Sequence, residues 1–256
     1  MKTKLLALAA VAAMSLGTVA TAAALKVGVA AEPYPPFTVP DASGKWSGWE
    51  VDILDAICAD QKLDCVITPT AWDGIIPALT GGQIDLILSS MSITDARKKV
   101  IDFSDKYYET PASLATAKDA TFGITADALA GKVIGVETSS TNEAYARKFF
   151  AAKSTIKVYP TADEATQDLA AGRVDAVVGD EMALQGFLAT DQGKACCKQT
   201  VLPYDKETLG DGIGAGFRKS DTALRDQFNK GIADIRANGT YDTISKKYFD
   251  FNIYGE

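Results

Sequence analysis

The amino-acid sequence predicts an α/β protein made of two similar units, each containing a largely parallel sheet. The first observation is an apolar run at residues 84–88, which follows two glycines and has the length of a strand buried on both faces. The second is a partial repeat. Residues 79–90 (LTGGQIDLILSS) resemble residues 169–180 (LAAGRVDAVVGD), and residues 27–33 (VGVAAEP) begin like residues 134–140 (IGVETSS). Chance similarity is the alternative, because short strands of this kind are common in α/β folds.

The first 24 residues predict a signal peptide. A basic start (MKTK) is followed by an apolar stretch and by small residues suited to cleavage between about residues 22 and 25. No cysteine stands at the cleavage site, and no later apolar run is long enough to span a membrane. We therefore expect an unanchored protein, free in an envelope compartment.

The charge of the chain disfavours polyanionic partners. The net charge is −7, and it becomes −9 when Lys2 and Lys4 are removed with the signal peptide. Nucleic acid and anionic membrane surfaces are therefore poor partners. The mature chain, roughly 230 residues, has the length of one domain or two, and the repeat favours two.

The first predicted helix carries one of the four cysteines. Ile53, Leu54, Ile57 and Cys58 share an apolar helix face, and Cys65 opens the next strand. A disulfide between Cys58 and Cys65 would join helix to strand, with a chain-entropy stabilisation of about 2.5 kcal/mol.

The adjacent pair Cys196 and Cys197 has three alternative states: bonded to each other, free, or bonded to another molecule. Zinc is not expected, because the cysteine spacing matches no ligand pattern and the chain contains no histidine.

The strand at residues 84–88 leads into a predicted anion site. Ser89 and Ser90 follow it at the sheet edge where ligands bind in α/β folds, and Thr94 reads as the N-cap of a short helix that contains Arg97. Hydroxyl groups, helix N–H groups and a guanidinium suit a carboxylate or a phosphate. The alternative is that Arg97 is a surface residue paired with Asp95 or Asp102.

In the repeat, Asp180 occupies the position of Ser90. One unit thus offers hydroxyl groups and a cation, while the other offers a carboxylate. This is what the zwitterion of an α-amino acid needs from two facing units.

The absence of histidine excludes Ser-His-Asp and Cys-His catalysis. Acid–base chemistry by Glu32, Glu137 or Asp180 remains an option. The sequence has no phosphate-binding loop, no dinucleotide fingerprint and no calcium loop, so we expect no cofactor and no metal.

Several motifs together resemble a known family. They are residues 48–53 (GWEVDI), 72–79 (WDGIIPAL) and 89–97 (SSMSITDAR), the pair Asp180-Glu181, and residues 238–255 (NGTYDTISKKYFDFNIYG). In this combination, over essentially the whole mature chain, they resemble the periplasmic polar amino-acid-binding proteins of ABC importers, and most closely the lysine/arginine/ornithine and histidine binders.

The resemblance implies a two-lobed type II periplasmic binding protein fold. Lobe 1 would comprise residues 25–110 and 208–256, lobe 2 residues 111–207, and the chain would cross near residues 109–112 and 205–210.

The resemblance also implies residue roles. Arg97 would hold the ligand α-carboxylate with Ser90, Ser92 and a backbone or hydroxyl donor at Ser140 or Thr141, with Ser89 nearby. Asp180 would hold the α-ammonium group. Tyr34 and Trp72 align with the aromatic pair that encloses the ligand side chain, and ordinary core packing is their alternative role.

Specificity is where the chain departs from the basic amino-acid binders. The aspartate that these binders carry before the aromatic residue aligns with Ala31, but Glu32 stands next to it, and Glu137 replaces an apolar contact. Two acidic groups suggest a cationic side chain, unless both point into solvent. A polar amino acid is the broader expectation, and an opine-like derivative fits the same anchors.

The function that follows is ligand capture by a monomer and delivery to the membrane permease of an ABC importer, without enzymatic activity. Two alternatives share the fold: a periplasmic cyclohexadienyl dehydratase that uses Glu32 or Glu137 as its acid, and a sensor subunit that presents ligand to a receptor.

Overall fold

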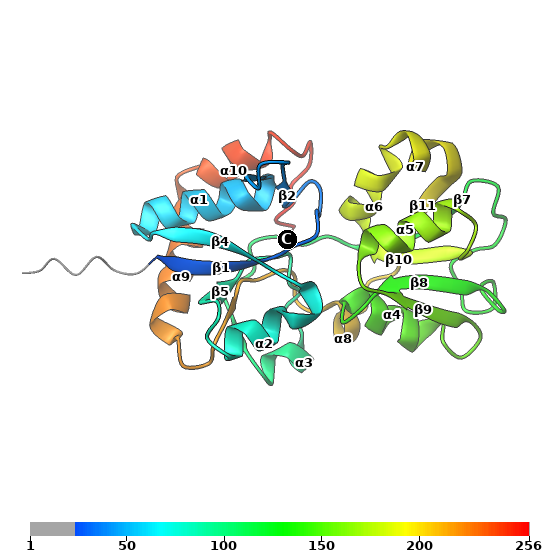
Figure 1. Ribbon diagram of the computed structural model, residues 1–256, viewed down its shortest axis with the longest axis horizontal. Helices are drawn as coiled ribbons and strands as arrows, with labels where there is room; N and C mark the ends of the chain where they lie inside the picture. Colours follow the sequence, from blue (N-terminus) through cyan, green and yellow to red (C-terminus); the bar gives the residue numbers. More distant parts are fainter. Residues whose placement is uncertain (1–23, 256) are drawn as a thin grey trace, which may run out of the picture.

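The computed structural model describes residues 24–255, which form two lobes side by side (Figure 1). Each lobe contains one five-stranded sheet, with strand order β4-β1-β5-β12-β6 in lobe 1 and β11-β7-β10-β8-β9 in lobe 2. The predicted two-unit α/β fold is therefore confirmed. The predicted signal peptide, residues 1–24, lies outside the described residues except for Ala24.

Helices cover both faces of the lobe 1 sheet, where two separate apolar clusters form. Strand β1 pairs in parallel with β4 and β5, whereas β12 is antiparallel to its neighbours. The strands are β1 (Leu25–Ala30), β4 (Cys65–Thr70), β5 (Leu86–Ile87), β6 (Asp102–Phe103) and β12 (Gly216–Phe217), with a hairpin of β2 (Val39–Pro40) and β3 (Trp46–Ser47). The helices are α1 (Trp49–Gln61), α9 (Thr222–Ala237) and α10 (Thr240–Ser245) on one face, and η1 (Trp72–Gly74), α2 (Ile75–Thr80) and α3 (Asp95–Lys98) toward the other.

Lobe 2 has the same layered arrangement. Strand β8 is parallel to β9 and β10, and β7 is antiparallel to β10 and β11. The strands are β7 (Ala112–Ala117), β8 (Val133–Glu137), β9 (Thr155–Tyr159), β10 (Ala176–Asp180) and β11 (Cys197–Val201). One face carries α4 (Thr141–Phe149) and α8 (Lys206–Leu209), and the other carries α5 (Ala162–Ala170), α6 (Glu181–Leu188) and α7 (Asp191–Cys196).

The sequence repeat has a physical basis in matching turns. Gly82 and Gly172 both adopt positive φ angles, 73° and 69°, which favour glycine. Asp85 and Asp175 follow, and each accepts a hydrogen bond, at 2.9 Å in both cases, from a backbone N–H near the start of the neighbouring strand, β1 or β8. The two units therefore share one way of joining a helix to a parallel strand.

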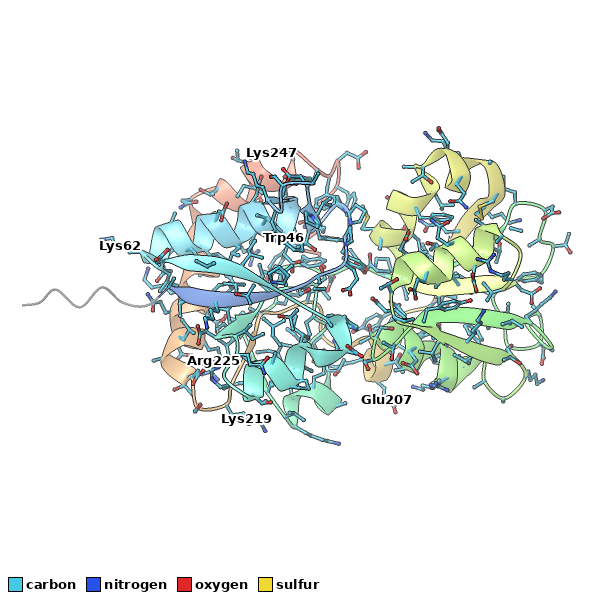
Figure 2. The ribbon with its side chains drawn as sticks, viewed as in Figure 1. Trp46, Lys62, Glu207, Lys219, Arg225 and Lys247 are labelled. Atoms are coloured by element: carbon cyan, nitrogen blue, oxygen red, sulfur yellow. A yellow bond between two sulfur atoms is a disulfide. The ribbon has the colours of Figure 1, made fainter. Side chains whose placement is uncertain are left out.

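The chain passes between the two sheets twice, once between β6 and β7 and once between β11 and β12. Lobe 1 is thus built from two separate parts of the chain. Glu207 of α8 lies at the junction of the lobes (Figure 2) and pairs with Lys148 of α4 at 2.7 Å, so this part of the second crossing packs on lobe 2. The residue limits of the lobes given above stay a prediction.

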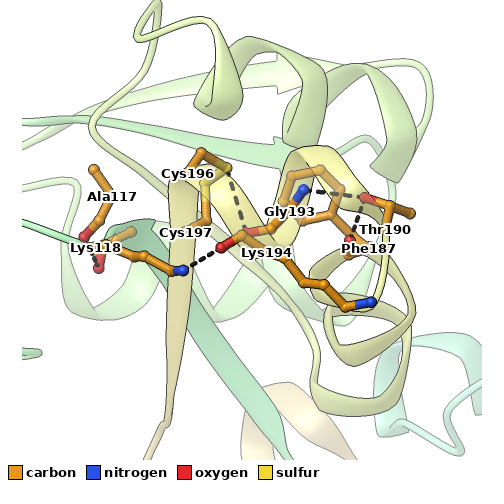
Figure 3. The surroundings of a disulfide bond; sticks show 9 residues. Ala117, Lys118, Phe187, Thr190, Gly193, Lys194, Cys196 and Cys197 are labelled. Atoms are coloured by element: carbon orange, nitrogen blue, oxygen red, sulfur yellow. Dashed lines mark hydrogen bonds between the residues drawn. A yellow bond between two sulfur atoms is a disulfide. The ribbon is translucent and has the colours of Figure 1, made fainter.

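Both cysteine pairs are bonded. The disulfide between Cys58 and Cys65 joins the end of α1 to the start of β4, as expected. Cys196 and Cys197 are bonded to each other where α7 meets β11 (Figure 3), which selects one of the three alternatives. Within residues 24–255, none of the helices combines the length and the apolar character needed to cross a bilayer.

Candidate ligand-binding site

A cavity of about 770 Å³ lies between the lobes. Its walls come from segments that follow parallel strands of both sheets, which is the edge where α/β folds bind ligands. Every residue that the sequence predicted for the site lines this cavity: Glu32, Tyr34, Trp72, Ser89, Ser90, Ser92, Arg97, Glu137, Ser140, Thr141 and Asp180.

Arg97 is positioned by the helix that the sequence predicted. Thr94 is the N-cap of α3, and its hydroxyl oxygen accepts a hydrogen bond from the Arg97 N–H at 3.2 Å. The guanidinium donates to the carbonyl group of Ser92 at 3.0 Å and, across the cleft, to that of Ser139 at 3.1 Å. Burial lowers its pKa to about 10, so the group stays charged at neutral pH. Because a guanidinium has five N–H donors, three remain for a ligand carboxylate.

The surface alternative for Arg97 does not describe this structure. Asp95 pairs weakly with Lys98, at 3.9 Å, and Asp102 pairs with Arg225. Both carboxylates therefore have other partners, and Arg97 turns toward the cavity.

Ser89 and Ser90, in the loop after β5, both form hydrogen bonds within lobe 1. The hydroxyl oxygen of Ser89, a buried residue, accepts a hydrogen bond from the Ala30 N–H at 2.8 Å, so it joins two loops of lobe 1. Ser90 donates both its N–H and its hydroxyl hydrogen to Glu50. It therefore lacks the free donor that the expected contact with a carboxylate requires.

Ser92 and the N-terminus of α4 meet across the cleft. The hydroxyl oxygens of Ser92 and Thr141 lie 3.3 Å apart. Ser140 is the N-cap of α4: its oxygen accepts from the Glu143 N–H at 3.0 Å, and its hydrogen is donated to the carbonyl group of Glu137 at 2.7 Å. Of the two donors left open by the sequence, Thr141 is therefore the one with a hydroxyl group directed at lobe 1.

Asp180 ends β10 and is the N-cap of α6. Its Oδ1 accepts hydrogen bonds from the N–H groups of Met182 and Ala183 at 2.9 and 3.1 Å, and its Oδ2 accepts one from the Thr110 hydroxyl. Burial raises the pKa of the carboxyl group to about 6. A carboxylate accepts about four hydrogen bonds, so one position remains for an ammonium group.

Glu32 and Glu137 form an acidic pair with one residue from each lobe. Burial, followed by the negative charge of Glu32, raises the pKa of Glu137 to about 7, while a backbone hydrogen bond from Ala162 and the charge of Arg97 oppose the shift. The Oε2 atom of Glu32 is buried and has no hydrogen-bond partner among the described residues. Neither side chain therefore points freely into solvent, as the alternative required.

Tyr34 and Trp72 line the cavity from lobe 1 and also contact apolar clusters of that lobe. Tyr34 stacks on Phe37, with ring centroids 5.7 Å apart. The indole N–H of Trp72 donates to the carbonyl group of Thr138 in lobe 2 at 3.1 Å, and the Arg97 guanidinium lies 5.4 Å from the ring centroid. Trp72 therefore joins the lobes, a contact that the sequence did not indicate.

Some cavity residues were missed by sequence reasoning. They include Tyr108, Thr110 and the first turn of α5 (residues 161–164), which have no motif. Glu50, behind Ser90, did carry a signal. It precedes Ile53, Leu54 and Ile57 at the i+3, i+4 and i+7 spacing of a buried helix face, where an acidic residue is unusual.

Named relatives share this architecture over most of the chain. The lysine/arginine/ornithine-binding periplasmic protein of Escherichia coli is 41% identical over 225 residues, which are 87% of this chain and 86% of the relative. The L-arginine-binding protein of Pseudomonas aeruginosa is 41% identical over 256 residues, or 99% and 98% of the two chains.

Solved structures agree with the fold. An ancestral arginine-binding protein bound to arginine superposes with a TM-score of 0.81 at 34% identity, covering 88% of this chain and 98% of its own. An ancestral amino-acid-binding protein described as a precursor of cyclohexadienyl dehydratase gives 0.77 at 30% identity, covering 89% and 95%. The family model of bacterial extracellular solute-binding proteins, family 3, matches residues 25–251. On these grounds, the chain belongs to the family 3 bacterial extracellular solute-binding proteins.

Proposed function

We propose that this protein captures a basic amino acid in the periplasm and delivers it to the permease of an ABC importer. The observation that carries the proposal is the charge pattern of the cavity, where Arg97 shares the lining with Glu32 of lobe 1 and with Glu137 and Asp180 of lobe 2. Arg97 binds the α-carboxylate, Asp180 binds the α-ammonium group, and Glu32 and Glu137 bind the cationic end of the side chain. A ligand with two positive charges and one negative charge satisfies all of these groups.

Ligand binding drives closure of the two lobes. A ligand held first by Arg97 on lobe 1 gains the contact to Asp180 only when lobe 2 approaches, so it has higher affinity for the closed form. The closed monomer, with the lobe limits predicted above, presents the surface that the permease recognises.

The protein acts by binding rather than by catalysis. Its named relatives are binding proteins. A dehydratase would use Glu137, whose pKa is near neutrality, as its acid. Turnover of prephenate or arogenate by the purified protein would establish that alternative, and capture of a membrane receptor in a pull-down would establish a sensor role.

Calorimetry on ligand-stripped, refolded protein tests the proposal. We expect lysine, arginine, ornithine or histidine to bind with a Kd in the micromolar range or tighter, for which about 8 kcal/mol is needed. Glutamine and glutamate should bind more weakly. Glu32→Gln and Glu137→Gln should each weaken binding of the basic ligand, whereas Glu207→Gln, an exposed change at the lobe junction, should not. Preference for neutral or acidic ligands would contradict the cationic part of the proposal.

A further inference from the structure

Glu50 is a buried carboxylate that the binding scheme above does not use. It belongs to α1, has no solvent exposure and is not among the residues that line the cavity. Its Oε1 accepts hydrogen bonds from the Tyr107 hydroxyl and, at 2.8 Å, from the Ser90 N–H. Its Oε2 accepts from the Ser90 hydroxyl at 3.1 Å. A buried carboxylate held only by uncharged donors among the described residues is costly, and such a group often has a role beyond stability.

The arrangement determines what Ser90 presents to the cavity. Ser90 has a φ of 50°, an unusual value for a residue other than glycine, and both of its hydrogen-bond donors are directed to Glu50. Its hydroxyl oxygen and its carbonyl oxygen remain, and both are acceptors. Ser90 therefore suits a positively charged donor and disfavours a carboxylate.

Ser90 and the carboxylate proposed to bind the ammonium group, Asp180, line the same cavity from different lobes. Tyr108 also lines this cavity, and burial together with the negative charges of Glu50 and Asp180 raises the pKa of its hydroxyl group. A ligand in the cavity can therefore meet acceptors from both lobes.

We propose that Glu50 is a positioning residue that fixes Ser90 as a hydrogen-bond acceptor for the α-ammonium group of the ligand. This inference rests on the proposed function and deepens it. Glu50 never touches the ligand and acts through the orientation of one hydroxyl hydrogen.

The substitution Glu50→Gln tests the mechanism with almost no change in shape. The amide oxygen replaces Oε1, because the opposite orientation would set an NH₂ group against the Ser90 N–H and the Tyr107 hydroxyl. The NH₂ group then replaces Oε2, so the Ser90 oxygen must accept from it and the Ser90 hydrogen turns toward the cavity. We expect roughly 10- to 100-fold weaker binding of L-lysine, the range for loss of a charge-assisted hydrogen bond.

Two comparisons distinguish this role from a general structural effect. 6-Aminohexanoate is lysine without its α-amino group, so Glu50→Gln should leave its affinity unchanged. In a Ser90→Ala background, Glu50→Gln should change lysine affinity by less than about twofold, because no hydroxyl remains to reorient. If Glu50→Gln does not fold, Ser90→Ala alone should weaken lysine but not 6-aminohexanoate.

The outcomes separate the two proposals. Equal lysine affinity in wild type and Glu50→Gln would overturn the inference alone. So would the same loss in the Ser90→Ala background, because a long-range effect of the Glu50 charge would then suffice. Failure of the wild-type protein to bind any basic amino acid would remove the proposed function and the inference together.

Discussion

At Glu137, two effects act in the same direction: burial and the nearby charge of Glu32 both favour the protonated carboxyl group. Binding of a cationic side chain favours the ionised form, so ligand and proton compete. Because the pKa of the free protein is about 7, affinity for lysine should rise with pH by up to roughly tenfold per unit below pH 7 and level off above it.

Calorimetry in buffers of different ionisation enthalpy measures this competition. Binding at pH 6.5 should release most of one proton in wild type and a much smaller fraction in Glu137→Gln. The smaller fraction comes from the carboxyl group of Asp180, whose pKa of about 6 leaves roughly a quarter of it protonated at pH 6.5. A Kd that is constant from pH 6 to 8 would contradict the assignment of Glu137 to the cationic group.

Arg97 is the single cation among the residues that line the cavity. Arg97→Ala removes the charge-assisted hydrogen bonds proposed for the α-carboxylate, each worth about 1.5–3 kcal/mol, so affinity should fall well over tenfold. Melting temperature shows whether the fold is retained. Arg147→Ala is the matched control, because Arg147 is exposed and pairs with Glu143 on the surface of α4. Retained affinity in Arg97→Ala would remove this residue from the site.

The sequence predicted which serines lie at the cavity, but it did not predict the direction of their hydrogen bonds. Ser90 was expected to donate to a carboxylate, yet its donors go to Glu50, 40 positions earlier in the chain. A backbone or hydroxyl donor was expected at Ser140 or Thr141, and the hydroxyl group of Ser140 instead caps its own helix. Local patterns predict which residues lie at a strand end, whereas hydrogen-bond direction depends on partners that only the folded chain supplies.

Among the secondary-structure elements, α6 depends on the residue proposed to bind the ammonium group. Asp180→Asn keeps an oxygen that accepts from the N–H groups of Met182 and Ala183, whereas Asp180→Ala does not. Both variants should lose more than tenfold in ligand affinity. Only Asp180→Ala should also lose about 1 kcal/mol of unfolding free energy through the missing cap, as measured by urea denaturation. Full affinity in Asp180→Asn would show that the carboxylate serves α6 alone.

The disulfide between Cys58 and Cys65 links two elements of lobe 1, α1 and β4. Replacing Cys58 and Cys65 together with alanine should lower the unfolding free energy by about 2.5 kcal/mol, because the unfolded chain gains the entropy of a short loop. Lysine affinity should stay unchanged, since neither residue lines the cavity. A variant with wild-type stability in urea denaturation would contradict the entropic expectation.

Element boundaries with a strong local signal were well predicted. The helix ending near Cys58, the strand opening at Cys65 and the cap at Thr94 all agree with the structure. Strand β5 is shorter than the apolar run suggested, because only Leu86 and Ile87 pair as a strand, although the whole of residues 86–88 is buried. The apolar pattern predicts which residues are buried. The length of a strand depends instead on the backbone hydrogen bonds that neighbouring strands can form with it.

Within residues 24–255, three hydrogen bonds beside the cavity join the lobes away from the two places where the chain crosses between them. They run from Trp72 to the Thr138 carbonyl group, from Arg97 to the Ser139 carbonyl group, and between Ser92 and Thr141. No sequence motif predicts these contacts. Two of the three acceptors are backbone carbonyl groups, which every residue type supplies. The existence of these contacts depends on how the two lobes are placed.

Trp72→Phe keeps an aromatic ring at the site but removes the indole donor. We expect a larger radius of gyration of the ligand-free protein in small-angle scattering and roughly two- to tenfold weaker ligand binding, the range for one neutral hydrogen bond. Trp46→Phe, on strand β3 of lobe 1 (Figure 2), should change neither quantity, because Trp46 is not among the residues that line the cavity. Unchanged scattering and affinity in Trp72→Phe would show that this contact does not contribute to closure.

The double passage of the chain between the sheets also bears on biogenesis. The apolar face of α1, including Trp49 and Ile57, is covered by Phe228 and Ile232 of α9, which come from the last part of the chain. A polypeptide that leaves a translocation channel N-terminus first exposes α1 long before α9 emerges. Lobe 1 therefore cannot complete its apolar core until nearly the whole chain has left the channel.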